Sequence, residues 1–328
     1  MFRFAILPVV IFASQLGVAG AAFNSAKKAQ VLWSDPGPVE RLDLGAGPAG
    51  RAGQPRSPFR FIKEDKSGTS AKIFVRDARG RLWNVKFGDE VRAETFGSRL
   101  AWAAGYFAEP SYFVRNGRVA GVSGLSRRAA RHVGPGGEFK DARFQLRDPR
   151  FRFLDENNWS WSYNPFVGTR ELAGLKILLM LTSNWDNKDA RDVDAGSNTA
   201  IFRTSSAGRP VYIYAFTDWG RTMGNWGSVF ERSTWNCGDF ADETPELVSV
   251  RLEGGERKLK WGYSGRHTRE FARDIRVSDV RWFLQRFGRL RPAQIRAALI
   301  ASGADRREAD CFAGQLRARI EALRRAVE

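Results

Sequence analysis

The sequence predicts an α+β protein in two parts: a small antiparallel sheet with one helix over residues 59–145, and a mainly helical part over residues 146–328. In the first part, alternating strands precede and follow a single helix, which is not the pattern of a βαβ repeat. In the second part, one helix is apolar on nearly all sides and three helical segments end the chain.

The N-terminal elements follow from alternation and periodicity. Apolar and polar residues alternate in three predicted strands, 59–62, 71–75 and 82–87, and a tight turn at 77–80 joins the last two. Helical periodicity runs from Ala93 to Phe107. A second hairpin is predicted with strands at 112–114 and 119–122 and a turn at Asn116-Gly117. Residues 126–160 are basic and give few signals.

In the C-terminal part, Thr169 is a suitable N-cap for a buried helix over 170–181. A polar stretch, 184–197, precedes two predicted strands, 199–202 and 211–216, around a turn at Ala207-Gly208. Helices are then predicted at 278–287, at 292–301 and from 305 to the end. The middle one has Pro at its first position, where proline is favoured.

The N-terminus predicts export. Residues 1–21 resemble a signal peptide, with a charge at Arg3, a short apolar run and the small residues Ala19-Gly20-Ala21. Residues 22–58, rich in Pro, Gly and Ala, form a linker or an arm that wraps the domain. We therefore expect a periplasmic or extracellular protein. There Cys237 and Cys311 can form one disulfide, although two separate buried thiols fit the sequence as well.

Composition narrows the function classes. The 328 residues hold 53 Lys+Arg against 36 Asp+Glu, so the formal net charge of +17 gives the surface a positive field. Two Cys and two His argue against a zinc module and a histidine-based nucleophile relay. No G-x-S-x-G elbow occurs, and no G-x-G-x-x-G opens a helix after a strand, which disfavours serine hydrolases and dinucleotide binding. The positive charge suggests an anionic envelope polymer or a membrane surface as the partner. Nucleic acid is a less natural partner for an exported protein.

Polar residues that suit phosphoryl transfer stand at the ends of apolar elements. Lys86 ends a strand, and Glu94 opens the next helix. Asp186 follows the buried helix, and Asn198 and Asp218 flank the two later strands. Phosphoryl transfer uses a strand lysine on the phosphates, a helix glutamate that holds it, a loop carboxylate for the nucleophile, and an amide and a carboxylate for Mg²⁺. The chain supplies these groups in that order.

In these residues the chain resembles the protein-kinase-like superfamily, especially its atypical bacterial and secretory branch of HipA-type, CotH-type and lipid-kinase-like members. The likeness covers roughly residues 59–227. It rests on Val85-Lys86-Phe87, the helix opened by Glu94, the spacing of Asp186-Asn187-Lys188, and Thr217-Asp218-Trp219-Gly220. It implies a two-lobed fold that binds ATP with Mg²⁺ or Mn²⁺. Lys86 would bind phosphates and Glu94 orient it, with Asp186 and Lys188 catalytic and Asp218 on the metal.

The chain departs from the family's pattern at two points. The usual position of the second metal ligand is Arg191, so Asn198 takes that role if 189–197 is an insertion, and Asn187 otherwise. No full glycine-rich loop is present, and Ser67-Gly68-Thr69 is the candidate to cover the phosphates.

We expect an exported ATP phosphotransferase that acts on a protein, a lipid head group or a sugar. Transfer of AMP instead of a phosphoryl group stays open, and so does the oligomeric state. The alternatives are an inactive pseudokinase that serves as a binding module in the cell envelope, and a basic surface binder of anionic polymers.

Overall fold

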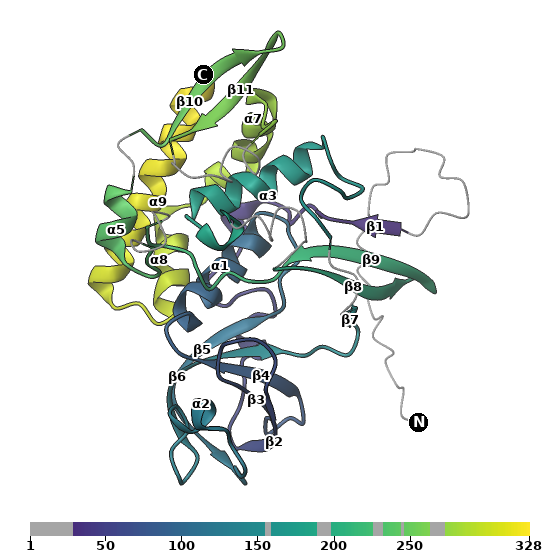
Figure 1. Cartoon of the computed structure of the whole chain (residues 1–328), viewed down its shortest axis with the longest axis vertical. Helices are drawn as coiled ribbons and strands as arrows, with labels where there is room; N and C mark the ends of the chain where they lie inside the picture. The colour runs from purple at the N-terminus through teal and green to yellow at the C-terminus, as the bar shows by residue number, and fades with distance from the viewer. Residues whose placement is uncertain (1–28, 155–158, 189–197, 226–231, 244–245, 263–272) are drawn as a thin grey trace, which may run out of the picture.

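The computed structural model of the chain describes residues 29–154, 159–188, 198–225, 232–243, 246–262 and 273–328 (Figure 1). The predicted signal peptide, 1–21, and the predicted insertion, 189–197, lie outside these ranges. In the part of the chain that the structure describes, no helix has the length and apolar character needed to cross a bilayer. The fold mixes sheets and helices, as the sequence predicts.

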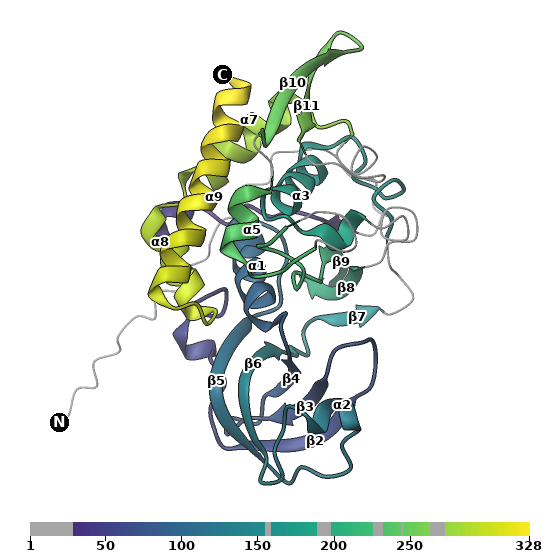
Figure 2. The same cartoon turned by 60° about the vertical axis from the view of Figure 1, so that its left-hand side comes forward.

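A closed five-stranded barrel forms the lower end of the molecule in Figures 1 and 2. Its strands, in the order β2-β3-β4-β6-β5, are β2 (Phe59–Asp65), β3 (Lys72–Arg76), β4 (Leu82–Phe87), β6 (Glu138–Leu146) and β5 (Ser111–Ala120). The expectation of a simple antiparallel sheet is corrected here, because β2 also pairs with β5 in parallel and closes the barrel. Buried side chains such as Ile73, Trp83 and Phe144 fill its interior.

The predicted hairpin at Asn116-Gly117 is wrong, because both residues lie inside the continuous strand β5. Asn116 pairs with Lys140 and Gly117 with Phe139 of β6. A Cβ at Gly117 would lie 2.4 Å from the Phe139 ring, so the glycine makes room for that ring and does not form a turn. Strand β6 is the true partner of β5. It falls in the stretch that gives few sequence signals: residues 142–146 do alternate, but the buried residues Phe139 and Ala142 are three positions apart, which breaks the alternation.

Helices occupy the other end of the molecule, with α1 (Val91–Ala103) between them and the barrel (Figure 2). They are α3 (Arg170–Leu181), α5 (Cys237–Asp242), α7 (Val277–Arg286), α8 (Pro292–Ala301) and α9 (Arg306–Val327), and a short helix, α2 (Arg127–Ala130), lies at the barrel. The buried helix and the three C-terminal helices are confirmed. Thr169 caps α3 as expected, since its hydroxyl accepts a hydrogen bond of 3.2 Å from the Leu172 N–H.

The C-terminal part is less helical than expected. A four-stranded sheet runs β1-β9-β8-β7, and a separate hairpin protrudes at the upper end (Figure 1). These strands are β1 (Ala29–Val31), β7 (Arg152–Leu154), β8 (Thr199–Ser206), β9 (Arg209–Phe216), β10 (Val248–Glu253) and β11 (Glu256–Trp261). The predicted turn between β8 and β9 is confirmed, with positive φ at Ala207 and Gly208. Short 3₁₀ turns complete the fold: η1 (Val39–Arg41), η2 (Arg51–Gly53), η3 (Trp185–Lys188) and η4 (Phe287–Arg289).

Two further contacts hold the chain together. Residues 29–58 form an ordered arm, because β1 pairs in parallel with β9 and Leu32, Val39 and Leu44 join the main core. Cys237 of α5 and Cys311 of α9 form a disulfide, so the alternative of two separate thiols is wrong.

Candidate functional site

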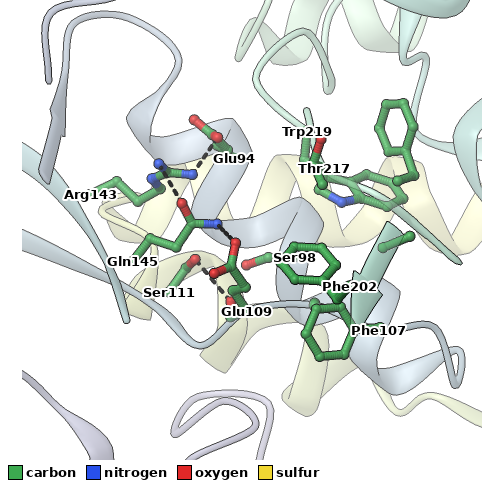
Figure 3. A pocket seen from close by; sticks show the side chains of 13 residues that line it. Glu94, Ser98, Phe107, Glu109, Ser111, Arg143, Gln145, Phe202, Thr217 and Trp219 are labelled. Atoms are coloured by element: carbon green, nitrogen blue, oxygen red, sulfur yellow. Dashed lines mark hydrogen bonds and ion pairs between the residues drawn. The ribbon is translucent and has the colours of Figure 1, made fainter. Parts of the chain in front are cut away.

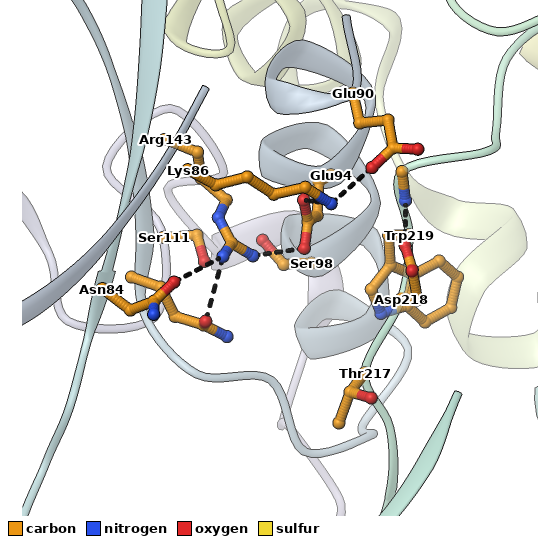
Figure 4. A network of polar contacts seen from close by, with 12 residues as sticks. Asn84, Lys86, Glu90, Glu94, Ser98, Ser111, Arg143, Thr217, Asp218 and Trp219 are labelled. Carbon is orange, nitrogen blue, oxygen red and sulfur yellow. Dashed lines mark hydrogen bonds and ion pairs between the residues drawn. The ribbon is translucent and has the colours of Figure 1, made fainter. Parts of the chain in front are cut away.

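Lys86 lies where β4 leads into α1, and two carboxylates of that helix region surround it. Its Nζ is 3.0 Å from Glu94 Oε2 and also forms an ion pair with Glu90 (Figure 4). Burial disfavours the charged lysine, but Glu94, Asp218 and Glu90 outweigh it and raise the pKa of the ammonium above its ordinary value. Lys86 is thus a charged side chain that is buried and held in place by ion pairs.

Lys86 is the middle of a row of cations across the barrel wall. It pairs directly with Lys72 of β3 on one side and with Arg143 of β6 on the other. Residues paired directly across strands share a face, and like charges in such positions repel. All three side chains line the same cavity. This row suits an anionic ligand.

Arg143 connects Glu94 to Gln145 and Glu109, which line the same cavity. Its guanidinium donates to Glu94 and, at 3.1 Å, to Gln145 Oε1. Gln145 in turn donates to Glu109 at 2.8 Å, so the polar groups form a continuous chain (Figure 3). Burial raises the pKa of the Glu109 carboxyl, while Arg147 and Arg143 oppose the shift. Arg143 therefore holds one carboxylate oxygen of Glu94, Oε1, while Lys86 holds the other, Oε2.

A second polar group faces this one from the segments around β8 and β9. Asn198, just before β8, donates from Nδ2 to Asp186 Oδ2 at 3.2 Å. Asp218, just after β9, accepts at Oδ1 from the Gly220 N–H at 2.9 Å. Burial, and then the negative charge of Asp218, raise the pKa of Asp186. The two carboxylates are therefore close enough to repel each other.

Hydrogen bonds between the flanking segments explain why residues so distant in sequence converge. The Asn184 side chain donates to the Asp218 carbonyl at 3.0 Å, and the Trp185 N–H donates to the Arg221 carbonyl at 3.3 Å. On the other side, the Thr217 N–H donates to the Asn198 carbonyl at 2.9 Å. Asn198 adopts a φ of 61°, a left-handed conformation that asparagine tolerates better than most residues.

Two glycines let α1 approach the Asp218 turn. A Cβ on Gly97 would lie 2.5 Å from Trp219 Cβ, and a Cβ on Gly220 would lie 2.9 Å from Glu90 Cβ. Neither glycine has a positive φ, so close packing is what requires them. This packing brings Asp218 near Lys86.

Both polar groups border one cavity of about 220 Å³. Its lining comprises Lys72, Asn84, Lys86, Glu94, Glu109, Arg143, Gln145, Arg147, Phe153, Asn198, Phe202, Thr217 and Asp218. Four of the sequence-predicted residues, Lys86, Glu94, Asn198 and Asp218, thus share one cavity. Asp186 reaches this group through its hydrogen bond with Asn198.

The predicted phosphate-covering segment, Ser67-Gly68-Thr69, does not line this cavity. It is the exposed turn between β2 and β3, and Arg128 of α2 donates to the Gly68 and Thr69 carbonyls at 2.7 and 3.1 Å. The following residue, Ser70, does reach the site, since its hydroxyl donates to Glu90 at 3.3 Å.

The remaining predicted residues are only partly described. Asn187 and Lys188 belong to η3, and their side chains lie outside the described part. Arg191 lies outside it altogether.

The donor set fits a magnesium ion that is also held by phosphate. Among the described residues, no three His, Cys, Asp or Glu side chains gather as a metal site. Mg²⁺, however, usually binds one or two carboxylates together with substrate phosphates and water. Asp218 and the amide oxygen of Asn198 provide such a set, with Asp186 beside them.

Sequence reasoning missed Glu90, Arg143 and Arg221. Glu90 ion-pairs with both Lys86 and Arg221, whose Nε lies 2.6 Å from Glu90 Oε1. A signal for Glu90 was present, because it precedes Glu94 by four residues and so shares its helix face. No comparable signal marks Arg143 or Arg221.

Comparison with known proteins adds no identification. The chain matches no protein-family model, and no curated protein matches it. The functional assignment therefore depends on the geometry of the cavity and its charges.

Proposed function

We propose that this protein transfers a phosphoryl group from ATP, with Mg²⁺ or Mn²⁺, to a hydroxyl of a protein, lipid head group or sugar outside the cytoplasm. We further propose that its fold is kinase-like, with the barrel and α1 as the small lobe. One observation carries the proposal: the Lys86–Glu94 ion pair, Asn198 and Asp218 border a single cavity although they come from distant parts of the chain, and Asn198 donates to Asp186.

Each group has a role that its surroundings support. Lys86, held by Glu94, is a fixed cation for phosphate oxygens. The metal ion would be held by Asp218 and Asn198, and when bound it neutralises charge on the phosphates. Asp186 has a raised pKa, which suits a carboxylate that accepts the proton of an acceptor hydroxyl.

Labelled ATP tests the proposal directly. Purified protein is incubated with γ-labelled ATP and Mg²⁺ or Mn²⁺, and transfer of label to protein, lipid or sugar acceptors is measured. We expect Asp186→Ala and Asp218→Ala to reduce transfer by at least about a hundredfold, the usual scale for a general base or a charge-stabilising group. Asp310→Ala is the matched control, because this exposed α9 aspartate lies outside the site and pairs with Arg296 at the surface. Equal label transfer by Asp186→Ala, Asp218→Ala and Asp310→Ala would refute the proposed mechanism.

A second candidate is a nucleotide-binding module without catalysis. The position of Ser67-Gly68-Thr69 favours it, because Arg128 holds this turn by its carbonyls and the turn does not line the cavity. Under this alternative, ATP raises the unfolding temperature while no label is transferred. A ligand at 100 times its dissociation constant stabilises a protein by about 2.7 kcal/mol, which thermal unfolding detects readily.

A further inference from the structure

The carboxylate of Glu90 is bound by groups from three separate elements. Lys86 comes from β4, Arg221 follows the Asp218 turn, and Ser70 ends the turn between β2 and β3. Arg221 Nε lies 2.6 Å from Oε1, and the Ser70 hydroxyl lies 3.3 Å from Oε2, the oxygen that also contacts Lys86. Figure 4 shows the Lys86 ammonium between Glu90 and Glu94.

These three donors are the groups that proteins use to bind phosphate. An ammonium, a guanidinium and a hydroxyl offer charge-assisted and neutral hydrogen bonds to anionic oxygens. The same donors would serve a phosphoryl group placed where the Glu90 carboxylate now lies. Glu90 thus marks an anion position at the edge of the cavity.

The helix does not need the Glu90 side chain as a cap. Glu90 stands at the N-cap position of α1, but its side chain makes no capping hydrogen bond. Glu94 differs, because it is buried between Lys86 and Arg143 and so helps hold α1 to the barrel. Space for the Glu90 carboxylate depends on Gly220, whose added Cβ would lie 3.0 Å from Glu90 Oε2.

We propose that Lys86, Arg221 and Ser70 form a phosphate subsite, and that Glu90 occupies it until a phosphorylated ligand displaces it. The subsite deepens the proposed function, since it would hold a phosphoryl group of the nucleotide. It assigns Arg221 and Ser70 to ligand binding and makes Glu90 a competitor of the ligand.

This arrangement predicts opposite effects for two glutamates that contact the same lysine. Glu90→Gln removes the competing charge, so anion affinity rises. Glu94→Gln leaves Arg143 without its carboxylate and loosens Lys86, so anion affinity falls. Arg221→Gln removes one donor and also lowers affinity. Its side chain is 38% exposed, so this substitution is expected to leave the protein folded.

Calorimetric titration with inorganic tripolyphosphate, and separately with Mg·ATP, tests the inference. We expect Glu90→Gln to bind tripolyphosphate about tenfold more tightly than the wild type, and Glu94→Gln and Arg221→Gln to bind it about tenfold more weakly, the scale of one charge-assisted hydrogen bond. Ser70→Ala is expected to lose about two- to fivefold, the scale of a neutral hydrogen bond. Thermal unfolding of each variant confirms that it is folded.

The outcomes separate the subsite from the proposed function. Unchanged or weaker tripolyphosphate binding by folded Glu90→Gln overturns the subsite, and so does unchanged binding by Arg221→Gln. If the expected pattern appears with tripolyphosphate but the wild type transfers no label from ATP, the subsite stands and the phosphotransferase is refuted. If label transfer depends on Asp186 and Asp218 while Glu90→Gln binds tripolyphosphate like the wild type, the phosphotransferase stands and the subsite is refuted.

Discussion

Substitution of Gly97 by alanine tests whether the close contact between α1 and the Asp218 turn builds the site. Gly97 lies inside α1, where alanine normally stabilises a helix by about 0.5–1 kcal/mol. Here the new Cβ would lie 2.5 Å from Trp219 Cβ and 2.9 Å from Trp219 Cγ. Real side chains do not approach so closely, so either the helix or the turn has to move.

The expected magnitude is the difference of two opposing effects. Overpacking in a well-filled interior costs about 1–3 kcal/mol. Trp219 is 2% exposed, and Phe216 packs against it with ring centroids 4.9 Å apart, so its ring has little freedom to shift. After subtraction of the helix gain, Gly97→Ala is expected to destabilise the protein by roughly 0.5–2 kcal/mol.

Gly314→Ala is the matched control. Gly314 also lies inside a helix, α9, but its added Cβ would meet no atom within 4 Å. We expect this variant to be more stable than the wild type by about 0.5–1 kcal/mol. Denaturant unfolding measures both free energies, and labelled ATP measures transfer. Gly97→Ala is also expected to lose activity, because Asp218 precedes the displaced Trp219. The reasoning is refuted if Gly97→Ala stabilises the protein as much as Gly314→Ala.

Two further predictions concern stability. Because the folded pKa of Asp186 is raised, the wild type loses stability as pH rises above the ordinary aspartate pKa of 3.8, so Asp186→Asn is expected to stabilise the protein at pH 7 by roughly 0.5–2 kcal/mol. Unfolding at several pH values checks this, and the gain should vanish below pH 3.8; a constant gain would contradict the charge argument. The Cys237→Ser/Cys311→Ser variant is expected to lose about 4 kcal/mol by the chain-entropy relation for a separation of 74 residues. Equal unfolding midpoints of this variant and the wild type would count against that estimate.

The elements predicted from the sequence are those with strong local signals. Helix α3 carries its own cap in Thr169 and is apolar all round, and α8 begins with Pro292. Strand β4 matches its predicted bounds, and the turn at Ala207-Gly208 follows from the glycine, which accepts a positive φ. In each case neighbouring residues determine the structure, so a single sequence suffices.

The errors arise where distant contacts decide the structure. Asn116-Gly117 is a strong turn signal, yet Gly117 serves to accept the Phe139 ring from another strand. Barrel closure depends on the pairing of Phe59 with Val119, which no local pattern shows. Strand β6 was missed because its buried residues Phe139 and Ala142 are three positions apart, which leaves only a short alternating stretch at residues 142–146. Such tertiary effects override local propensity.

The residues of the candidate site also fall into those that the sequence predicted and those that it did not. The order of Lys86, Glu94, Asp186 and Asp218 along the chain was sufficient to identify a group that the structure brings together. The residues that set the charge balance, Glu90, Arg143 and Arg221, were not identified. An arginine is a common surface residue, and only its burial against Glu94 distinguishes Arg143 from the others.

The charge balance links metal binding to phosphate binding. Lys86, Arg143 and Arg221 form ion pairs with Glu90 and Glu94, and Asp186 and Asp218 lie beside them. Glu94 and Glu90 are paired with cations, so the uncompensated negative charge lies at Asp186 and Asp218. A divalent cation there would offset this negative charge. It would also strengthen the attraction for phosphate at the position that Glu90 holds. Because each ligand supplies the charge that the other needs, we expect a cation and a polyphosphate to bind this site together more tightly than either binds alone.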